Sequence, residues 1–229
     1  LRVRALLDCV LSPTLALSCL DNPARDRTQA YGARRTEILG QAALAQARQA
    51  LSHWQGYAVT PLHSLPALAQ ALGVAAVHYK DEGGRFGLGS FKALCGAYAV
   101  ARLLCRELGA RLGRTLSSQD LLAPEVRALC ADITVTCATD GNHGRSVAWG
   151  AQLFGCRCVI YIHATVSEGR KQAIAKYGAD VVRTAGNYDD AVRQADSDAK
   201  LHGRFVISDT SYPGYMDVPR DVMQGYQLM

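Results

Sequence analysis

Between residues 133 and 208 the sequence alternates short apolar, β-branched runs with stretches of helical length. The expected strands are residues 133–138, 158–162, 181–182 and 205–208, and the expected helices are residues 144–154, 167–177 and 188–202. Short connections between such elements imply right-handed crossovers and parallel strands. The run 158–162 is apolar throughout, which is typical of a strand covered on both faces. The sequence therefore predicts an α/β fold in which a parallel sheet carries helices on both faces.

Polar segments follow three of the expected strands. The loop 139–144 follows the first strand of this unit, and Asp209 with Thr210 follows the last. A glycine-rich loop follows a further expected strand at residues 74–80. Ligands of open parallel sheets bind at the carboxyl ends of the strands. We therefore expect the three segments to converge on one crevice, with Lys92 on its rim.

The glycine-rich loop, residues 83–92, reads Gly-Gly-Arg-Phe-Gly-Leu-Gly-Ser-Phe-Lys and leads into an expected helix that ends near Gly109. Apolar residues recur at helical spacing after Lys92, so this lysine is expected in the first helical turn. The positive end of the helix dipole disfavours a second positive charge, which makes the amine a better nucleophile. Taken alone, the stretch favours a solvated lysine after a flexible loop, and the interpretation as a nucleophile depends on a second motif.

A second motif, residues 139–144, reads Thr-Asp-Gly-Asn-His-Gly and precedes a helix. Exposed backbone amides at a helix start form an anion site that suits a carboxylate. Asn142 adds a neutral hydrogen-bond donor. A lysine, a carboxylate site and an asparagine facing one crevice are what an aldehyde cofactor acting on amino acids requires.

Composition excludes several classes of partner and site. The chain has 229 residues, enough for one large or two small domains, and a net charge of +5 with no basic run interleaved with aromatics, so no nucleic-acid partner is expected. No apolar run is long enough to span a membrane. The eight cysteines form no Cys-x-x-Cys pair. They are interpreted as buried thiols in a reducing, cytoplasmic compartment, with no metal site.

The remaining segments carry weaker signals. Residues 1–28 are expected to be a loose arm, and residues 28–54 a helix with a weak point at Gly40. Ser64 is expected to cap a helix that contains Pro66 and ends at Gly73. Further helices are expected at residues 124–130 and from Pro219 onward. The chain begins with Leu and ends without a helix cap, so we expect it to be a fragment.

Ser90-Phe91-Lys92 and the loop after residue 138 together resemble the pyridoxal-phosphate enzymes of the tryptophan-synthase-β type, which have fold type II. Within that group the chain is most similar to the diaminopropionate ammonia-lyases, from about Tyr31 to its end. The similarity is carried by residues 80–92, 138–145, 187–190, 208–210 and 223–226. Asp140 is the most discriminating residue, because cysteine synthases and threonine dehydratases carry a serine there.

The resemblance implies a role for each site residue. Lys92 would hold the aldehyde of pyridoxal 5'-phosphate as a Schiff base and then take the Cα proton of an L-substrate. Asn142 would bind the ring hydroxyl and Phe91 would cover one ring face. The carboxylate of the amino-acid substrate would lie on the backbone amides of Thr139, Asp140, Gly141 and His143.

Two aspartates have alternative interpretations. Asp140 would be the base for a D-substrate on the opposite ring face, a partner for a cationic amine, or a simple helix cap. Asp209 would bind the second amino group of the substrate, or be an ordinary turn residue. His143 is expected to be held through its backbone, without acting as an acid or base.

The implied reaction is α,β-elimination of 2,3-diaminopropionate to pyruvate and ammonia. The alternatives are another fold type II enzyme, such as a threonine or serine dehydratase, and a non-catalytic remnant of the fold. The resemblance places the phosphate-binding loop and the C-terminal part of the large domain beyond residue 229, so residues 1–229 alone are expected to be inactive and the full-length protein a homodimer. The expected parts are an arm with part of the large domain (1–90), a small domain (91–210) and the return to the large domain (211–229).

Overall fold

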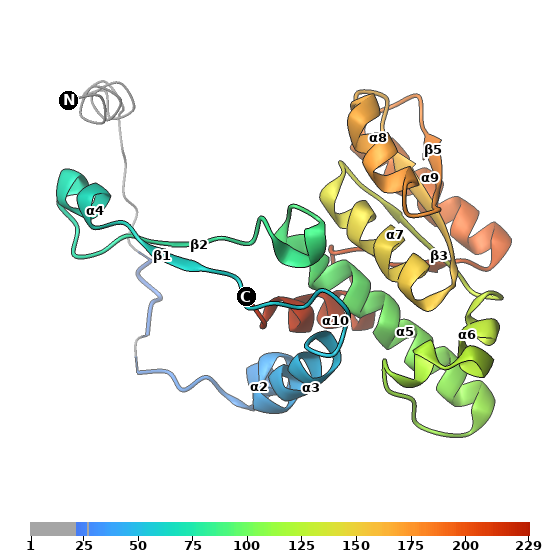
Figure 1. The fold of residues 1–229 in the computed structure, drawn as a ribbon, viewed down its shortest axis with the longest axis horizontal. Helices are drawn as coiled ribbons and strands as arrows, with labels where there is room; N and C mark the ends of the chain where they lie inside the picture. The colour runs from blue at the N-terminus through green and yellow to red at the C-terminus, as the bar shows by residue number, and fades with distance from the viewer. Residues whose placement is uncertain (1–21, 27) are drawn as a thin grey trace.

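The computed structural model describes residues 22–26 and 28–229, so residues 1–21 and 27 of the loose N-terminal segment expected at residues 1–28 lie outside the described residues. Figure 1 shows a body built around a sheet and several helices, from which a thin segment projects. The helices are α2 (Ala33–Leu39), α3 (Gln41–Leu51), α4 (Pro66–Leu72), α5 (Cys95–Leu112), α6 (Pro124–Cys130), α7 (Asn142–Phe154), α8 (Glu168–Ala175), α9 (Tyr188–His202) and α10 (Asp217–Tyr226). The strands are β1 (Leu62–Ser64), β2 (His78–Lys80), β3 (Thr134–Ala138), β4 (Arg157–Ile162), β5 (Asp180–Arg183) and β6 (Phe205–Val206).

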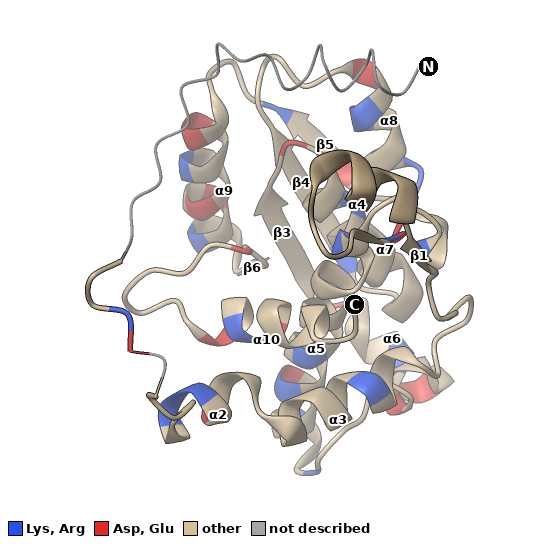
Figure 2. Cartoon of the chain, turned by 90° about the vertical axis from the view of Figure 1, so that its left-hand side faces the viewer, with Lys and Arg blue, Asp and Glu red and all other residues tan. Residues whose placement is uncertain are grey.

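The central sheet has four parallel strands in the order β5-β4-β3-β6, which confirms the predicted parallel arrangement. Helix α9 covers one face, and α7 and α8 cover the other (Figure 2). Val159 and Tyr161 pack beneath α9, whereas Ile160 and Ile162 belong to the larger core on the α7 side. Side chains alternate along a strand, so a continuously apolar run places buried residues on both faces.

Helix α5 lies against α7 and α10 and joins the sheet unit to the rest of the body. The crossings are close because glycines stand at the contacts. A Cβ on Gly150 would lie 2.7 Å from the Cα of Ala97, and one on Gly225 would lie 3.0 Å from the Cα of Cys95. Cys95 is fully buried at this crossing, where Gly225 lets α10 approach the backbone of Leu94 and Cys95.

A thin segment, which we call the arm (residues 57–84), extends from the body and carries α4 (Figure 1). Its strands β1 and β2 pair antiparallel and form a separate two-stranded sheet. The expected strand 74–80 is thus reduced to His78–Lys80, and the glycine loop does not follow a strand of the parallel sheet. Ser64 is the last residue of β1, so its predicted cap role was wrong. Leu65 precedes α4, with Pro66 in the first turn.

A buried ionic cluster fixes the base of the arm to the glycine loop. The guanidinium of Arg85 donates to Glu82 from Nε at 2.7 Å and from Nη2 at 2.8 Å. Thr60 donates its hydroxyl to the same carboxylate at 2.5 Å, and Lys80 Nζ donates to the Thr60 carbonyl at 2.7 Å. Burial alone would raise the pKa of Glu82, but the hydrogen bonds from Arg85 and Thr60 hold that pKa below its usual value. The two ends of the arm are thereby fixed to each other.

Other boundaries differ from the predictions for local reasons. The expected helix 28–54 is divided into α2 and α3 at Gly40, whose backbone is extended. Lys92 lies in a 3₁₀ turn (Phe91–Ala93) immediately before α5, and α5 continues past Gly109 to Leu112. Helix α10 begins at Asp217, two residues before Pro219. Among the described residues, no helix has both the length and the apolar character needed to cross a membrane.

Six cysteines lie in the described part of the chain, and none of them forms a disulfide there. All except Cys105 are buried. Burial raises the pKa of Cys95 to about 11 and the pKa values of Cys105 and Cys156 to about 12. These thiols are therefore protonated at neutral pH and act as small apolar side chains of the core.

Candidate active site

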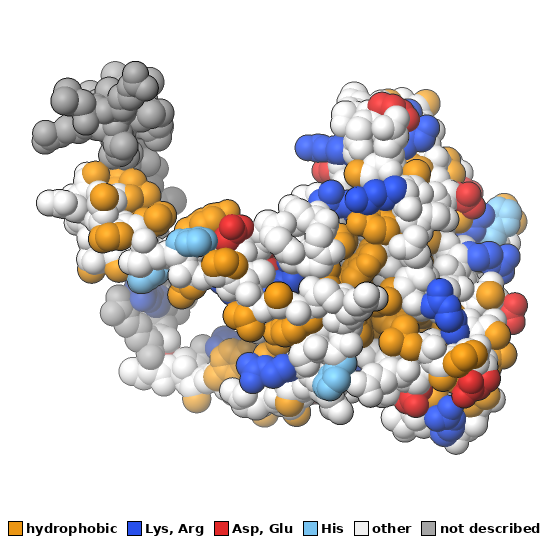
Figure 3. Space-filling view, viewed as in Figure 1, with side chains coloured by type: hydrophobic (Ala, Val, Ile, Leu, Met, Phe, Trp, Pro, Cys, Tyr) orange, Lys and Arg blue, Asp and Glu red, His pale blue; other side chains and the backbone are white. Residues whose placement is uncertain are grey.

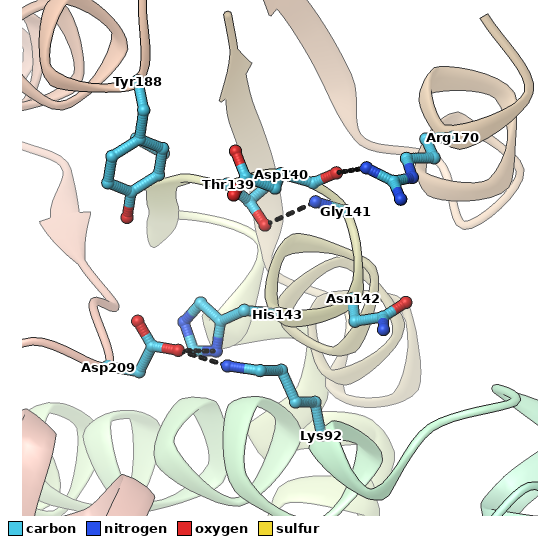
Figure 4. A pocket seen from close by; sticks show the side chains of 10 residues that line it. Lys92, Thr139, Asp140, Gly141, Asn142, His143, Arg170, Tyr188 and Asp209 are labelled. Atoms are coloured by element: carbon cyan, nitrogen blue, oxygen red, sulfur yellow. Dashed lines mark hydrogen bonds and ion pairs between the residues drawn. The ribbon is translucent and has the colours of Figure 1, made fainter. Parts of the chain in front are cut away.

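Lys92 reaches the carboxyl edge of the parallel sheet from the start of α5 (Figure 4). The Ser90 hydroxyl accepts a hydrogen bond from the Lys92 backbone N–H at 3.2 Å and caps the short 3₁₀ turn. Lys92 Nζ lies 2.6 Å from Asp209 Oδ2, and Asp209 follows β6. The structure therefore brings together the amine and the strand-end carboxylate that the sequence placed on one crevice.

The loop after β3 is shaped by a threonine side chain. Thr139 Oγ1 accepts hydrogen bonds at 3.0 Å from the backbone N–H groups of Gly141 and Gly144. Gly141 has φ 151°, a conformation that favours glycine, and the Arg170 side chain lies beside it. No acceptor in the described part of the chain is assigned to the N–H groups of Asn142 and His143, the first two residues of α7. They stand at the positive end of a helix of 13 residues and are suited to bind an anion.

His143 is held by its side chain as well as by its backbone. Its Nε2 lies 2.8 Å from the carbonyl oxygen of Ile207, and a carbonyl can only accept, so Nε2 carries the proton. Its buried Nδ1 has no hydrogen-bond partner among the described residues and lies 3.8 Å from Asp209 Oδ2. Burial lowers the pKa of His143, so the ring is neutral at neutral pH and presents a lone pair toward Asp209.

Asp209 is therefore held by one cation. Burial alone would raise the pKa of its carboxyl, but the hydrogen bond and charge of Lys92 lower that pKa below its usual value. Because His143 is neutral, the ammonium of Lys92 is the cation that stabilises the carboxylate. A second ammonium group brought into the cavity would meet both this carboxylate and the free Nδ1 of His143.

Asp140 faces the same cavity from the loop after β3, on the side opposite Lys92 (Figure 4). Its side chain makes no capping bond to α7, because Thr139 occupies that position. Asp140 Oδ1 instead lies 2.9 Å from His163 Nε2, and its backbone carbonyl accepts from Arg170 Nη1 at 3.4 Å. The interpretation of Asp140 as a helix cap therefore has no support in this geometry.

One cavity of about 250 Å³ gathers most of the predicted residues. Its wall consists of Lys92, Ala138, Thr139, Asp140, Gly141, Asn142, His143, Arg170, Tyr188 and Asp209. Phe91 lies outside this wall, with its ring centroid 5.5 Å from that of Tyr226. Arg170 and Tyr188 were not predicted as site residues. Both stand near the starts of helices that follow β4 and β5, so the strand-end rule applied to every strand would have indicated them.

The wall fits the aldehyde end of pyridoxal phosphate. Lys92 supplies a primary amine able to condense with an aldehyde, and Asn142 supplies a neutral amide for a ring substituent. The amides of the α7 start suit the carboxylate of an amino acid bound beside the cofactor. No group of three or more His, Cys, Asp or Glu side chains in the described part of the chain is arranged to bind a metal ion.

Comparison with known proteins agrees with this geometry. The family model described as pyridoxal-phosphate dependent enzyme matches residues 53–227. The chain is 43% identical over 173 residues to a diaminopropionate ammonia-lyase of Salmonella typhimurium, covering 76% of this chain and 43% of that protein. It is 40% identical over 199 residues to the diaminopropionate ammonia-lyase of Escherichia coli, covering 87% of this chain and 49% of that protein.

A solved structure is similar as well. The Escherichia coli diaminopropionate ammonia-lyase in complex with D-serine superimposes with a TM-score of 0.76 at 41% identity, covering 83% of this chain and 48% of that one. The chain thus spans about half the length of the curated relatives it matches. The likeness confirms the predicted fold type II α/β architecture. With its family model matched over residues 53–227, the chain belongs to the family of pyridoxal-phosphate-dependent enzymes.

Proposed function

We propose that this chain carries the lysine-bearing part of a lyase that converts 2,3-diaminopropionate to pyruvate and ammonia. The observation that carries the proposal is the cavity in which Lys92 and Asp140 face each other from opposite sides, with Asp209 beside Lys92. Its similarity to diaminopropionate ammonia-lyases supports the choice of substrate. Bound pyridoxal phosphate would act as the electron sink for the carbanion that forms when the Cα proton leaves.

The residues of this chain bind the substrate and transfer its Cα proton. The free amides of Asn142 and His143, at the start of α7, bind the substrate carboxylate and fix the orientation of Cα. The N–H groups of Thr139 and Gly141, which the resemblance also implied, already donate to the Tyr161 carbonyl and to Thr139 Oγ1. Lys92 Nζ binds the aldehyde and later accepts the Cα proton of the L-isomer. Asp140 accepts the Cα proton of the D-isomer from the opposite side. General bases placed in this way need to lie within hydrogen-bond reach of the proton that they remove.

Asp209 provides the substrate specificity. Its carboxylate, 2.6 Å from Lys92 Nζ, becomes available for another cation once the lysine amine is engaged with the aldehyde. The second ammonium of 2,3-diaminopropionate would replace that charge, and the free Nδ1 of His143 would accept from the same group. Asn142 binds the ring hydroxyl of the cofactor, and Phe91 covers one ring face after a side-chain movement from its position beside Tyr226.

The wider organisation is proposed on the same basis. We infer that residues 1–90 contribute to a large domain, residues 91–210 form the small domain and residues 211–229 return to the large one. The active protein is a homodimer. It works in the cytoplasm, where the free thiols of its core remain reduced.

The test is pyruvate release from the D- and L-isomers of 2,3-diaminopropionate by the protein expressed from its complete gene. Asp140→Asn is expected to lower kcat/KM for the D-isomer by roughly 10²–10⁴-fold and to affect the L-isomer far less. Asp217→Asn, at the exposed start of α10, is the matched control and leaves both rates unchanged. Faster turnover of serine or threonine than of either diaminopropionate isomer would favour a dehydratase. Equal losses on both isomers would contradict the assignment of Asp140.

A further inference from the structure

Asp140 is the first member of a chain of hydrogen bonds that leads away from the cavity. Its Oδ1 lies 2.9 Å from His163 Nε2, and His163 Nδ1 lies 3.0 Å from Thr165 Oγ1. Asp140 follows β3 and His163 follows β4, so these hydrogen bonds join the ends of two neighbouring strands. The His163 side chain is 18% exposed, whereas the Asp140 side chain is 66% exposed. The imidazole is thus the more firmly packed member of the pair.

The segment that carries His163 is anchored independently of Asp140. Arg183 on β5 donates to the backbone carbonyls of Ala164 at 3.0 Å and Val166 at 2.6 Å. The Val166 N–H donates to the His163 carbonyl at 3.2 Å. His163 therefore provides a fixed point, and the imidazole is the side-chain partner that the structure assigns to the Asp140 carboxylate.

The bonding pattern also defines which atoms carry protons. A carboxylate oxygen can only accept, so His163 Nε2 carries the proton of its hydrogen bond to Asp140 Oδ1. Nε2–H then donates to Asp140 Oδ1 and leaves Oδ2 as the basic oxygen of the carboxylate. His163 therefore sets the orientation of the Asp140 carboxylate.

We propose that His163 is a positioning residue that orients the carboxylate of Asp140 for D-substrates. The proposal rests on the function proposed above for Asp140 and extends it by one residue. The catalytic step is unchanged: the Cα proton of the D-isomer moves to Asp140 Oδ2, and its electron pair remains on the substrate carbon. His163 touches neither the substrate nor the reacting atoms, and it acts only through Asp140.

The other charged groups near the Asp140–His163–Thr165 hydrogen bonds are unchanged in the test. Arg170 on α8 contacts the Asp140 carbonyl, and Arg183 pairs with Glu168 of α8 at 3.2 Å. Lys171 lies 3.6 Å from the same glutamate, and Tyr188 at the start of α9 lines the cavity that Asp140 faces. Replacing His163 leaves all of these groups in place. A change in the D-isomer reaction therefore reports on the loss of the imidazole.

The experiment compares His163→Ala and His163→Gln, in the protein expressed from its complete gene, with both isomers over a range of pH. His163→Ala is expected to lower kcat/KM for the D-isomer by on the order of 10–100-fold, a range typical of a misplaced catalytic group, and to leave the L-isomer within about twofold. His163→Gln retains an N–H donor and restores most of the D-isomer rate. His202→Gln, exposed at the end of α9, is the matched control.

A readout without turnover separates this proposal from the proposed function. The ¹⁵N NMR signal of His163 Nε2 is expected to show a bonded proton and to shift in Asp140→Asn, with or without catalysis. Equal losses on both isomers, or unchanged D-isomer rates in His163→Ala, would overturn the positioning role. If the wild-type protein releases no pyruvate from either isomer, the proposed function fails, and the NMR signals alone decide whether His163 orients Asp140. An unchanged His163 signal in Asp140→Asn would overturn that as well.

Discussion

The arm and the parallel sheet unit are both built from short strands and helices, yet they are stabilised differently. Ile160 of β4 is fully buried, whereas Leu62 of β1 is 65% exposed and Tyr79 of β2 is 55% exposed. Helix α7 buries eight residues, and α4 buries only Ala69. Figure 3 shows the hydrophobic side chains of the arm on its surface. The sheet unit is therefore stabilised by a core, and the arm by backbone pairing and the cluster at its base.

This difference indicates where function and stability depend on single residues. Burial of apolar area contributes most of the free energy of folding, so the sheet unit is sensitive to each deleted methyl group. The arm has little buried area to lose, and its antiparallel pair is too small to be stable by itself. Its shape depends on the Glu82–Arg85–Thr60 cluster.

The largest expected difference is in activity, between the variants Lys92→Ala and Lys80→Ala. Lys92→Ala removes the amine that binds the aldehyde, and pyruvate release from 2,3-diaminopropionate is expected to fall by about 10³-fold or more. Lys80→Ala in the arm removes a hydrogen bond to the Thr60 carbonyl and a 3.9 Å ion pair with Glu82, but no residue of the cavity wall, and retains most activity. After borohydride reduction of the cofactor-loaded protein, peptide mapping should find the pyridoxyl group on Lys92. A label on Lys80 or Lys171 would contradict the site.

The next difference concerns stability. Ile160→Ala is expected to reduce the free energy of unfolding by about 2–5 kcal/mol, because it leaves a cavity in a fully buried strand. Leu62→Ala, at a largely exposed position, is expected to change it by less than about 0.5 kcal/mol. Urea titrations of both variants provide the comparison. A comparable loss in Leu62→Ala would mean that another part of the protein, or a second copy, covers the arm.

The smallest effect is a dependence of stability on pH. The pKa of His143 is lowered in the fold, so below its ordinary value of 6.5 the unfolded chain takes up a proton that the folded chain does not. Stability is therefore expected to fall by up to about 1.4 kcal/mol between about pH 7.5 and about pH 5.5. His143→Gln removes this part of the slope, whereas His78→Gln, exposed in the arm, retains it. Identical slopes in all three proteins would exclude His143 as its source.

The sequence was most informative where burial follows the period of the backbone. The helix over Tyr188–His202 and the strand after Arg157 were predicted closely, because caps, glycine stops and apolar runs agree there. The arm was predicted poorly. The antiparallel pairing of β1 with β2 depends on few side chains, and three-residue strands carry no readable period. The division at Gly40 was foreseen only as a weak point.

The site was predicted through its loops rather than through its contacts. Asp140, Asn142, His143 and Asp209 line one cavity, as the convergence of strand ends implied, and Lys92 joins them although the loop before it does not follow a strand of the parallel sheet. The partners of these residues could not be predicted. That Lys92 binds Asp209, and that Asp140 binds His163, depends on side-chain directions across the sheet. Such directions follow from tertiary packing and leave no pattern in the sequence.

The buried thiols of the folded state are unreactive toward alkylating reagents. A cysteine reacts with alkylating reagents as its thiolate, and the raised pKa of each buried cysteine removes that form at neutral pH. In a background where Cys9 and Cys19 are replaced by serine, iodoacetamide would therefore modify these positions only when the surrounding segment opens. Cys95 would report separation of α5 from α10, and Cys158 would report loss of β4 from the sheet. The protein thus contains its own set of probes for the order in which its layers come apart.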